Sequence, residues 1–228
     1  HRDLHSFPTR RSSDLYQEFK GVSLANIDAA AIFVRTDAPW KTLKDLLAEV
    51  KANPGKLKAS GTGKGGIWDL GRAGLLKAAG MSPSDMPWVP SNGAAAGLQE
   101  MMAGGVPVVA CSLPEAASLI DAKKVRPLVL MAEKRSEMYP DVPTAKELGY
   151  DWTMGAWRGI TVPKRTPANI VAVLEKSMKK AVEDPQFKKF MNEKGYGILY
   201  MTSDEFDKFM EKEDKIKGEV MKAAGIVN

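Results

Sequence analysis

Residues 57–70 of the chain read Leu-Lys-Ala-Ser-Gly-Thr-Gly-Lys-Gly-Gly-Ile-Trp-Asp-Leu. This stretch predicts a short strand over 57–60, a loop with four glycines in six residues, and a helix from about Ile67 to Ala79. Glycine keeps backbone N–H groups accessible, and the N-terminus of a helix attracts negative charge. The stretch therefore predicts an anion-binding loop in an α/β protein. The candidate ligand-binding residues in it are Ser60, Gly61, Thr62, Gly63, Gly65 and Gly66.

The same loop contains the spacing Gly-x-Gly-x-x-Gly, and Asp85 follows at about the distance of a ribose-binding acid in a dinucleotide fold. The strand before it is short and polar, whereas such folds bury an apolar parallel strand. A P-loop is excluded because no Ser or Thr follows Lys64 in the required frame. A nucleotide-dependent enzyme that binds phosphate with Gly61–Gly66 remains the alternative.

Strands and amphipathic helices alternate along the rest of the chain, which is typical of α/β proteins. Thr42 with Asp45, and Thr202 with Glu205, have the spacing of helix-capping pairs. The expected strands cover 29–34, 87–90, 106–111, 125–131 and 157–162. The further expected helices start at Thr42, Ala94, Pro114, Thr144, Pro167, Pro185 and Ser203. In the helix from Pro167, residues Ile170, Val171, Val173, Leu174 and Met178 recur at helical spacing and predict a core face.

Two more places in the chain suggest contacts with an anion. Residues 91–94 follow a predicted strand and open a helix, so they offer a second set of N–H groups, although such a stretch taken alone is more often a structural helix cap. Arg158 has the fork geometry that suits a carboxylate, although a surface ion pair is the commoner fate of an arginine. The added candidates are Ser91, Asn92, Gly93, Ala94, Trp157 and Arg158.

The composition excludes several classes of site. The chain has 33 basic and 28 acidic residues in 228, one cysteine and two histidines, His1 and His5. Residues 1–15 resemble the translation of a sequencing adapter, and outside them no histidine remains. A Ser-His-Asp triad, a Cys-His pair and a His-ligated or multi-cysteine metal site are therefore not expected. We also expect no cofactor, on the separate ground of the family resemblance given below. The lysines are interspersed with acidic residues, which argues against nucleic-acid binding. The sequence contains no run of 18 apolar residues, so we expect no membrane span.

Seven motifs follow one another along the chain: Lys41–Leu46, Ala52–Leu57, Ser60–Gly63, Val89–Gly93, Arg135 and Ser136 with Pro140–Thr144, Glu147 and Gly149, then Trp157, Gly159, Pro163, Thr166 and Pro167, and last Ala223–Ile226. In this order they make the sequence similar to the substrate-binding receptors of tripartite tricarboxylate transporters, the Bug family. The chain departs from the family pattern at Ser91 and Asn92, where an aromatic residue and a lysine are usual, and at Pro107, where an aspartate is usual.

The resemblance implies a two-lobed periplasmic-binding-protein-like α/β fold of type II, with a ligand cleft between lobes that close by a hinge. Residues 36–131 would form lobe 2, and 16–35 with 132–228 an incomplete lobe 1, since the family's opening strand and Pro-Gly-Gly loop would precede Tyr16. The implied protein is a periplasmic monomer that captures a small carboxylate without chemistry and delivers it to the membrane subunits of the transporter. A scaffold without any ligand is the third class that the sequence leaves open.

Overall fold

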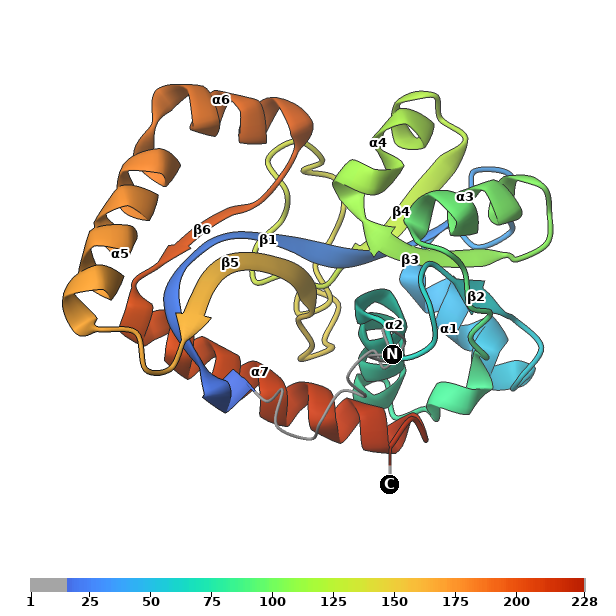
Figure 1. The fold of residues 1–228 in the computed structure, drawn as a ribbon. Helices are drawn as coiled ribbons and strands as arrows, with labels where there is room; N and C mark the ends of the chain where they lie inside the picture. The colour runs from blue at the N-terminus through green and yellow to red at the C-terminus, as the bar shows by residue number, and fades with distance from the viewer. Residues whose placement is uncertain (1–15, 228) are drawn as a thin grey trace, which may run out of the picture.

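The structure, a computed structural model, describes residues 16–227, so the expected adapter-derived segment 1–15 lies outside the described residues. The chain is α/β (Figure 1). The strands are β1 (Phe19–Arg35), β2 (Ala59–Ser60), β3 (Val108–Ser112), β4 (Val125–Leu130), β5 (Gly155–Pro163) and β6 (Ile198–Met201). The helices are α1 (Leu43–Ala52), α2 (Ile67–Ala78), α3 (Ala94–Met102), α4 (Leu113–Asp121), α5 (Ala168–Glu183), α6 (Pro185–Lys194) and α7 (Ser203–Ala223), with short 3-10 turns η1 (Tyr16–Glu18) and η2 (Pro83–Asp85).

Strand β1 runs through the centre of the molecule and takes part in two groups of strands (Figure 1). Its first part, from Phe19 to Ala29, pairs antiparallel with β5, and part of the same stretch pairs with β6. Its second part, from Ala30 to Arg35, pairs antiparallel with β3 and β4. The pairing partners therefore change between Ala29 and Ala30, and this point is called the β1 junction below.

The carboxyl ends of β2 and β3 point toward the β1 junction. The two strands are parallel, with Ser60 beside Val109, and Ser112 at the end of β3 lies opposite Ala30. The expected strand at 87–90 is reduced to a single parallel bridge between Trp88 and Ala59. Loops that follow parallel strands meet at one edge of a sheet, which is where ligands of α/β proteins bind.

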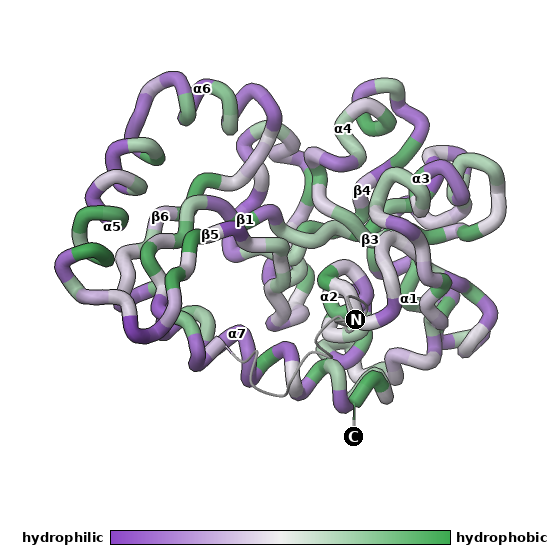
Figure 2. The backbone as a smooth tube through the Cα atoms, viewed as in Figure 1, coloured by the Kyte–Doolittle hydropathy of each residue, from purple (hydrophilic) through white to green (hydrophobic). Residues whose placement is uncertain are grey.

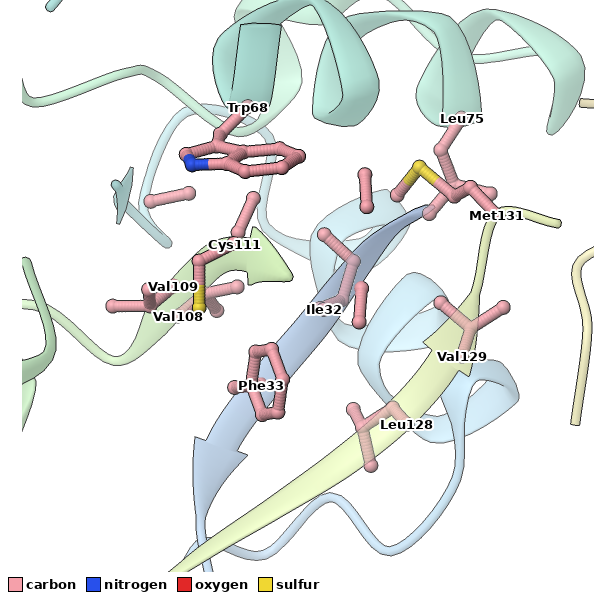
Figure 3. Packing of buried hydrophobic residues seen from close by; sticks show 14 of the residues in the cluster. Ile32, Phe33, Trp68, Leu75, Val108, Val109, Cys111, Leu128, Val129 and Met131 are labelled. Carbon is pink, nitrogen blue, oxygen red and sulfur yellow. The ribbon is translucent and has the colours of Figure 1, made fainter. Parts of the chain in front are cut away.

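Buried apolar side chains form one large cluster and one small one. The large cluster joins the second part of β1 to β3, β4, α1 and α2, and Figure 3 shows Trp68 and Leu75 of α2 pointing toward this sheet. The small cluster consists of Leu24, Phe206 and Met210, with partly buried neighbours that include Trp157. Helix α7 contributes to both, because Phe206 is buried in the small cluster and Val220 in the large one.

The structure corrects several sequence expectations. Strand β1 begins ten residues before the expected strand, β6 had no counterpart, and the expected strand 57–60 is limited to Ala59–Ser60. Residues after Thr144 form a turn instead of a helix. The expected core face of α5 is wrong in part: Val171 is 6% exposed, but Ile170, Val173 and Leu174 are 48%, 65% and 37% exposed. Hydrophobic positions recur along this helix at the rim of the molecule (Figure 2).

Candidate functional site

The glycine loop that leads from β2 into α2 is shaped by close packing at one glycine. A Cβ on Gly61 would lie 2.0 Å from the carbonyl oxygen of Ala110, so no larger residue fits against β3. Gly97 of α3 packs on the other side, where an added Cβ would lie 3.1 Å from the Gly61 backbone. Gly63 differs, because no atom lies within 4 Å of the position of its missing Cβ. The loop is thus packed at its start and open at Gly63.

The two predicted loops lie side by side and are bonded to each other. The N–H of Ser91 donates to the carbonyl of Thr62 at 2.9 Å, and the Ser60 hydroxyl donates to the carbonyl of Val89 at 2.8 Å. The indole N–H of Trp88 donates to the same Thr62 carbonyl at 3.0 Å. These bonds bring ten of the twelve candidate residues into one region: Ser60–Gly63, Gly65, Gly66 and Ser91–Ala94.

The helices that start at these loops differ from their neighbours in how they begin. Helices α1, α4 and α7 carry capping boxes at Thr42, Ser112 and Thr202. Among the helices of residues 16–227, three begin with no side-chain cap: α2 at Gly66, α3 at Gly93, and α5, which starts away from these loops at Pro167. The first N–H groups of a helix have no acceptor within the helix and carry partial positive charge. The N-termini of α2 and α3 can therefore both donate to an anion from outside.

Some N–H groups of the loop already have acceptors. The N–H of Gly65 donates to Asp69 Oδ2 at 2.9 Å, and the N–H of Gly66 donates to the carbonyl of Gly63 at 3.0 Å. Gly65 has φ of 76°, a conformation that favours glycine. These two residues shape the loop from within, and the open side lies at Gly63.

A buried ion pair supports the loop from inside α2. Asp69 and Arg72 are 1% and 4% exposed, and Arg72 Nη2 lies 2.6 Å from Asp69 Oδ1. Burial lowers the pKa of the Arg72 guanidinium, and the hydrogen bond to Asp69 opposes that shift. This pair was not predicted from the sequence, although an acid in the first turn of a helix followed three residues later by an arginine is a recognisable spacing. Trp88 was also missed, and nothing in its sequence context signals a hydrogen bond to Thr62.

The other two candidates lie on β5, in the part of the sheet that contains the first half of β1. Trp157 packs edge-on against Phe206 and Phe209, with ring centroids 5.5 and 5.8 Å away. The guanidinium of Arg158 donates to Asn26 and to the buried carboxylate of Asp28. Arg158 therefore already has a carboxylate partner within the chain, and Trp157 belongs to the small apolar cluster.

A large cavity lies elsewhere, along the β1 junction. It measures about 760 Å³, and its walls include Asp28 of β1, Pro114 of α4 and Gly197 before β6. None of the twelve candidate residues lines it. Within residues 16–227 no group of three or more His, Cys, Asp or Glu side chains could hold a metal ion. No helix in the same range is long and apolar enough to cross a membrane.

Comparison with known proteins decides the family. The profile of the tripartite tricarboxylate transporter family receptor, TctC, matches residues 9–226. The chain belongs to the TctC family. Among curated relatives of this TctC chain, a protein encoded in the gbd 5' region of Cupriavidus necator is 30% identical over 195 residues, which cover 86% of this chain and 58% of that protein. The matches to two further curated relatives cover 48% and 50% of their lengths, so the chain spans roughly half of these proteins.

Solved structures show the same fold. A TctC solute binding protein from Polaromonas, solved with no ligand, is 28% identical and superposes with a TM-score of 0.78 over 91% of this chain and 70% of that one. The structure of Rpa4515 from R. palustris with adipate is 22% identical, with a TM-score of 0.79 over 91% and 69% of the two chains. At that identity the second likeness concerns the fold alone. The expected α/β periplasmic-binding-protein fold is thereby confirmed.

Proposed function

We propose that this TctC-family chain is part of a periplasmic receptor that binds a small organic carboxylate and delivers it to the membrane subunits of a tripartite tricarboxylate transporter. It would act by binding alone, without chemistry on the ligand. The observation that carries the proposal is the pairing of two glycine loops, which places the uncapped N-termini of α2 and α3 in one region. The family description supports the transport role.

The loops suit a carboxylate because backbone N–H groups and helix dipoles recognise negative charge without titratable side chains. Each helix N-terminus typically stabilises a bound anion by about 0.3–1 kcal/mol at an exposed site, and by more where water is excluded. The open side at Gly63 leaves room for a ligand oxygen. Ser91 and Asn92 border this region and would adjust which acid is preferred.

The same proposal includes two lobes that close on the ligand. The sequence boundaries put residues 36–131 in lobe 2 and residues 16–35 with 132–228 in lobe 1. We add residues 30–35 to lobe 2, because this stretch of β1 pairs with β3 and β4. The change of pairing partners within β1 supports a hinge near the β1 junction, because a single strand there belongs to both groups. Trp157 and Arg158 would approach the ligand from lobe 1 upon closure, which requires Arg158 to share its bond with Asp28.

A thermal-shift panel tests the proposal against a nucleotide-dependent enzyme. The acids are citrate, malate, adipate, glutamate and benzoate, and NAD and ATP are the rival ligands. A ligand at 100 times its dissociation constant stabilises the folded state by about 2.7 kcal/mol, which moves the melting temperature measurably. The proposal predicts that at least one acid raises the melting temperature and that neither nucleotide does. Stabilisation by nucleotides alone would support the enzyme, and no shift by any compound would support a scaffold without a ligand.

A further inference from the structure

Asp69 and Arg72 form a buried ion pair in the first turns of α2, next to the glycine loop. Their side chains are 2% and 4% exposed, and the closest nitrogen and oxygen are 2.6 Å apart. Removing two charges from water is unfavourable, and apolar residues of similar volume often stabilise a core equally well. A contribution to the stability of the whole fold is therefore a weak explanation for the presence of this ion pair.

Both partners are connected to segments that shape the loop. Asp69 uses its second oxygen, Oδ2, to accept the N–H of Gly65 at 2.9 Å. Arg72 Nη1 donates to the carbonyls of Pro83 and Met86, each at 2.6 Å. One side of the pair thus holds the loop, and the other holds the segment that leads to Trp88.

Trp88 connects that segment to the loop a second time. The Arg72 guanidinium carbon lies 5.6 Å from the centroid of the Trp88 ring, and the indole N–H donates to the carbonyl of Thr62 at 3.0 Å. Thr62 and Gly65 are therefore both tethered to the same buried network. The open residue Gly63 lies between these two fixed points.

The charge of Asp69 matters for any anion at this place. A carboxylate in the first turn of α2 already interacts favourably with the helix N-terminus, and an unneutralised one would repel an anionic ligand. Arg72 forms hydrogen bonds to Asp69 Oδ1 through both Nε and Nη2, at 3.2 and 2.6 Å. The pair can therefore hold Gly65 with a carboxylate oxygen while presenting little net charge.

We infer that Asp69 and Arg72 are positioning residues of the carboxylate site: they hold the Gly61–Gly66 loop in its ligand-ready shape and cancel the charge of Asp69. This inference rests on the proposed function. A preformed loop loses less conformational freedom when a ligand binds, so affinity depends on the network although neither side chain touches the ligand.

The experiment compares three variants with the wild type, using the acid of the panel that binds it most tightly by calorimetry. The double variant Asp69→Leu/Arg72→Met removes both charges, so it folds without an unpaired buried ion. Arg72→Met alone leaves the carboxylate of Asp69 uncompensated. Leu46→Ala in α1, whose side chain is fully buried, lowers stability away from the loop and is the control.

The inference predicts that the double variant binds about tenfold more weakly per folded molecule, as expected for a typical coupling between a remote group and a site. The amide of Gly65 should also exchange with solvent faster than in the wild type. Arg72→Met should bind the acid more weakly still. Added NaCl should reduce the difference in affinity between Arg72→Met and the double variant, because salt screens the charge of Asp69. Leu46→Ala should bind like the wild type.

Two outcomes overturn the inference in different ways. If the wild type binds an acid and the double variant binds it equally tightly, the positioning role is wrong and the proposed function stands. If the wild type binds none of the five acids, the proposed function fails, and the inference fails with it. If Arg72→Met does not fold, the affinity of the double variant for the acid alone tests the positioning role.

Discussion

Two glycines in one loop have different physical roles. Gly61 is required by packing, because the Ala110 carbonyl oxygen occupies the place of a Cβ. The place of a Cβ on Gly63 is open, so the absence of a side chain there affects ligand binding and not packing. Substitutions at these two positions therefore separate stability from binding.

Replacing Gly61 by Ala should destabilise the fold. The added Cβ would lie 2.0 Å from the Ala110 oxygen, so β3 or the loop must move. We expect a loss of roughly 3 kcal/mol in the free energy of unfolding, at the upper end of typical point substitutions. Denaturant unfolding measures it, with Gly63→Ala as the matched control. Equal stability of the two variants would show that the loop does not pack on β3 as described.

Replacing Gly63 by Val should leave the fold intact and weaken carboxylate binding by at least about tenfold, because the side chain covers the open N–H groups. Gly218→Val in α7 is the control, since Gly218 also has no atom within 4 Å of its missing Cβ. Calorimetry with the tightest acid of the panel gives both affinities. Unchanged binding by Gly63→Val would remove this loop from the site.

At the same scale, the sequence predicted the glycine loops but not the partners of Trp157 and Arg158. Glycines before a helix are a local signal, readable within ten residues. Arg158 instead meets Asp28, a residue 130 positions away, because β5 pairs with β1. The pairing of the two strands determines which residue Arg158 contacts, and the sequence around Arg158 contains no signal of that pairing.

At the scale of elements, local capping signals were reliable and strand lengths were not. The capping boxes predicted for Thr42 with Asp45 and Thr202 with Glu205 are both present. Strand β1 was predicted too short, because its first part contains register shifts between Gly21 and Ser23 and between Leu24 and Asn26. Bulges of this kind break the alternation of apolar and polar residues on which strand prediction depends.

The turn after Thr144 shows the limit of a capping signal. The N–H of Thr144 donates to Glu147 at 2.7 Å, and the N–H of Glu147 donates to the Thr144 hydroxyl at 3.2 Å, so the reciprocal bonds form. Gly149, with φ of 88°, then turns the chain before a helix can extend. A cap nucleates one turn, and the following residues decide whether a helix continues.

Two valines of α5 give a prediction for that helix. Val171 is 6% exposed and Val173 is 65% exposed, so only the first loses packing when shortened. Val171→Ala should lower the free energy of unfolding by about 1–2 kcal/mol, and Val173→Ala by less than about 0.5 kcal/mol. Denaturant unfolding of both variants measures the difference. Equal losses would mean that Val173 is covered in solution.

The cap of α7 predicts a pH dependence. Hydrogen bonds from the Thr202 N–H and hydroxyl hold the pKa of Glu205 below its ordinary value of 4.5. A carboxylate with a lowered pKa in the folded state stabilises the fold above the unfolded pKa, and the benefit is lost as pH falls through the folded pKa. The melting temperature of Glu205→Gln should therefore lie below that of the wild type at pH 7, and the gap should close below about pH 4.5.

The control for this titration is Glu219→Gln, which removes the same charge from α7 at a distance from the cap. Glu219→Gln should not reproduce the gap seen for Glu205→Gln, because the bonds to Thr202 come from Glu205. A gap for Glu205→Gln that stays constant down to pH 3 would show that the ionised carboxylate does not contribute through the cap.

At the scale of the whole molecule, two elements connect the two groups of strands. Strand β1 changes partners at the β1 junction, and α7 packs on both apolar clusters (Figure 1). The residues that follow α7 also reach the proposed site, since a Cβ on Gly65 would lie 3.2 Å from Ile226. A rotation of one group of strands relative to the other would therefore change the contacts of the glycine loop. Such coupling is what a receptor that closes around its ligand requires.

Backbone amide chemical shifts, followed by NMR during titration with the tightest acid of the panel, report where the ligand binds. A ligand at the uncapped ends of α2 and α3 should shift the amides of Gly63, Ile67, Gly93 and Ala94 with one common dissociation constant. Shifts confined to the walls of the 760 Å³ cavity, such as Asp28 and Gly197, would place the ligand there instead and contradict the account.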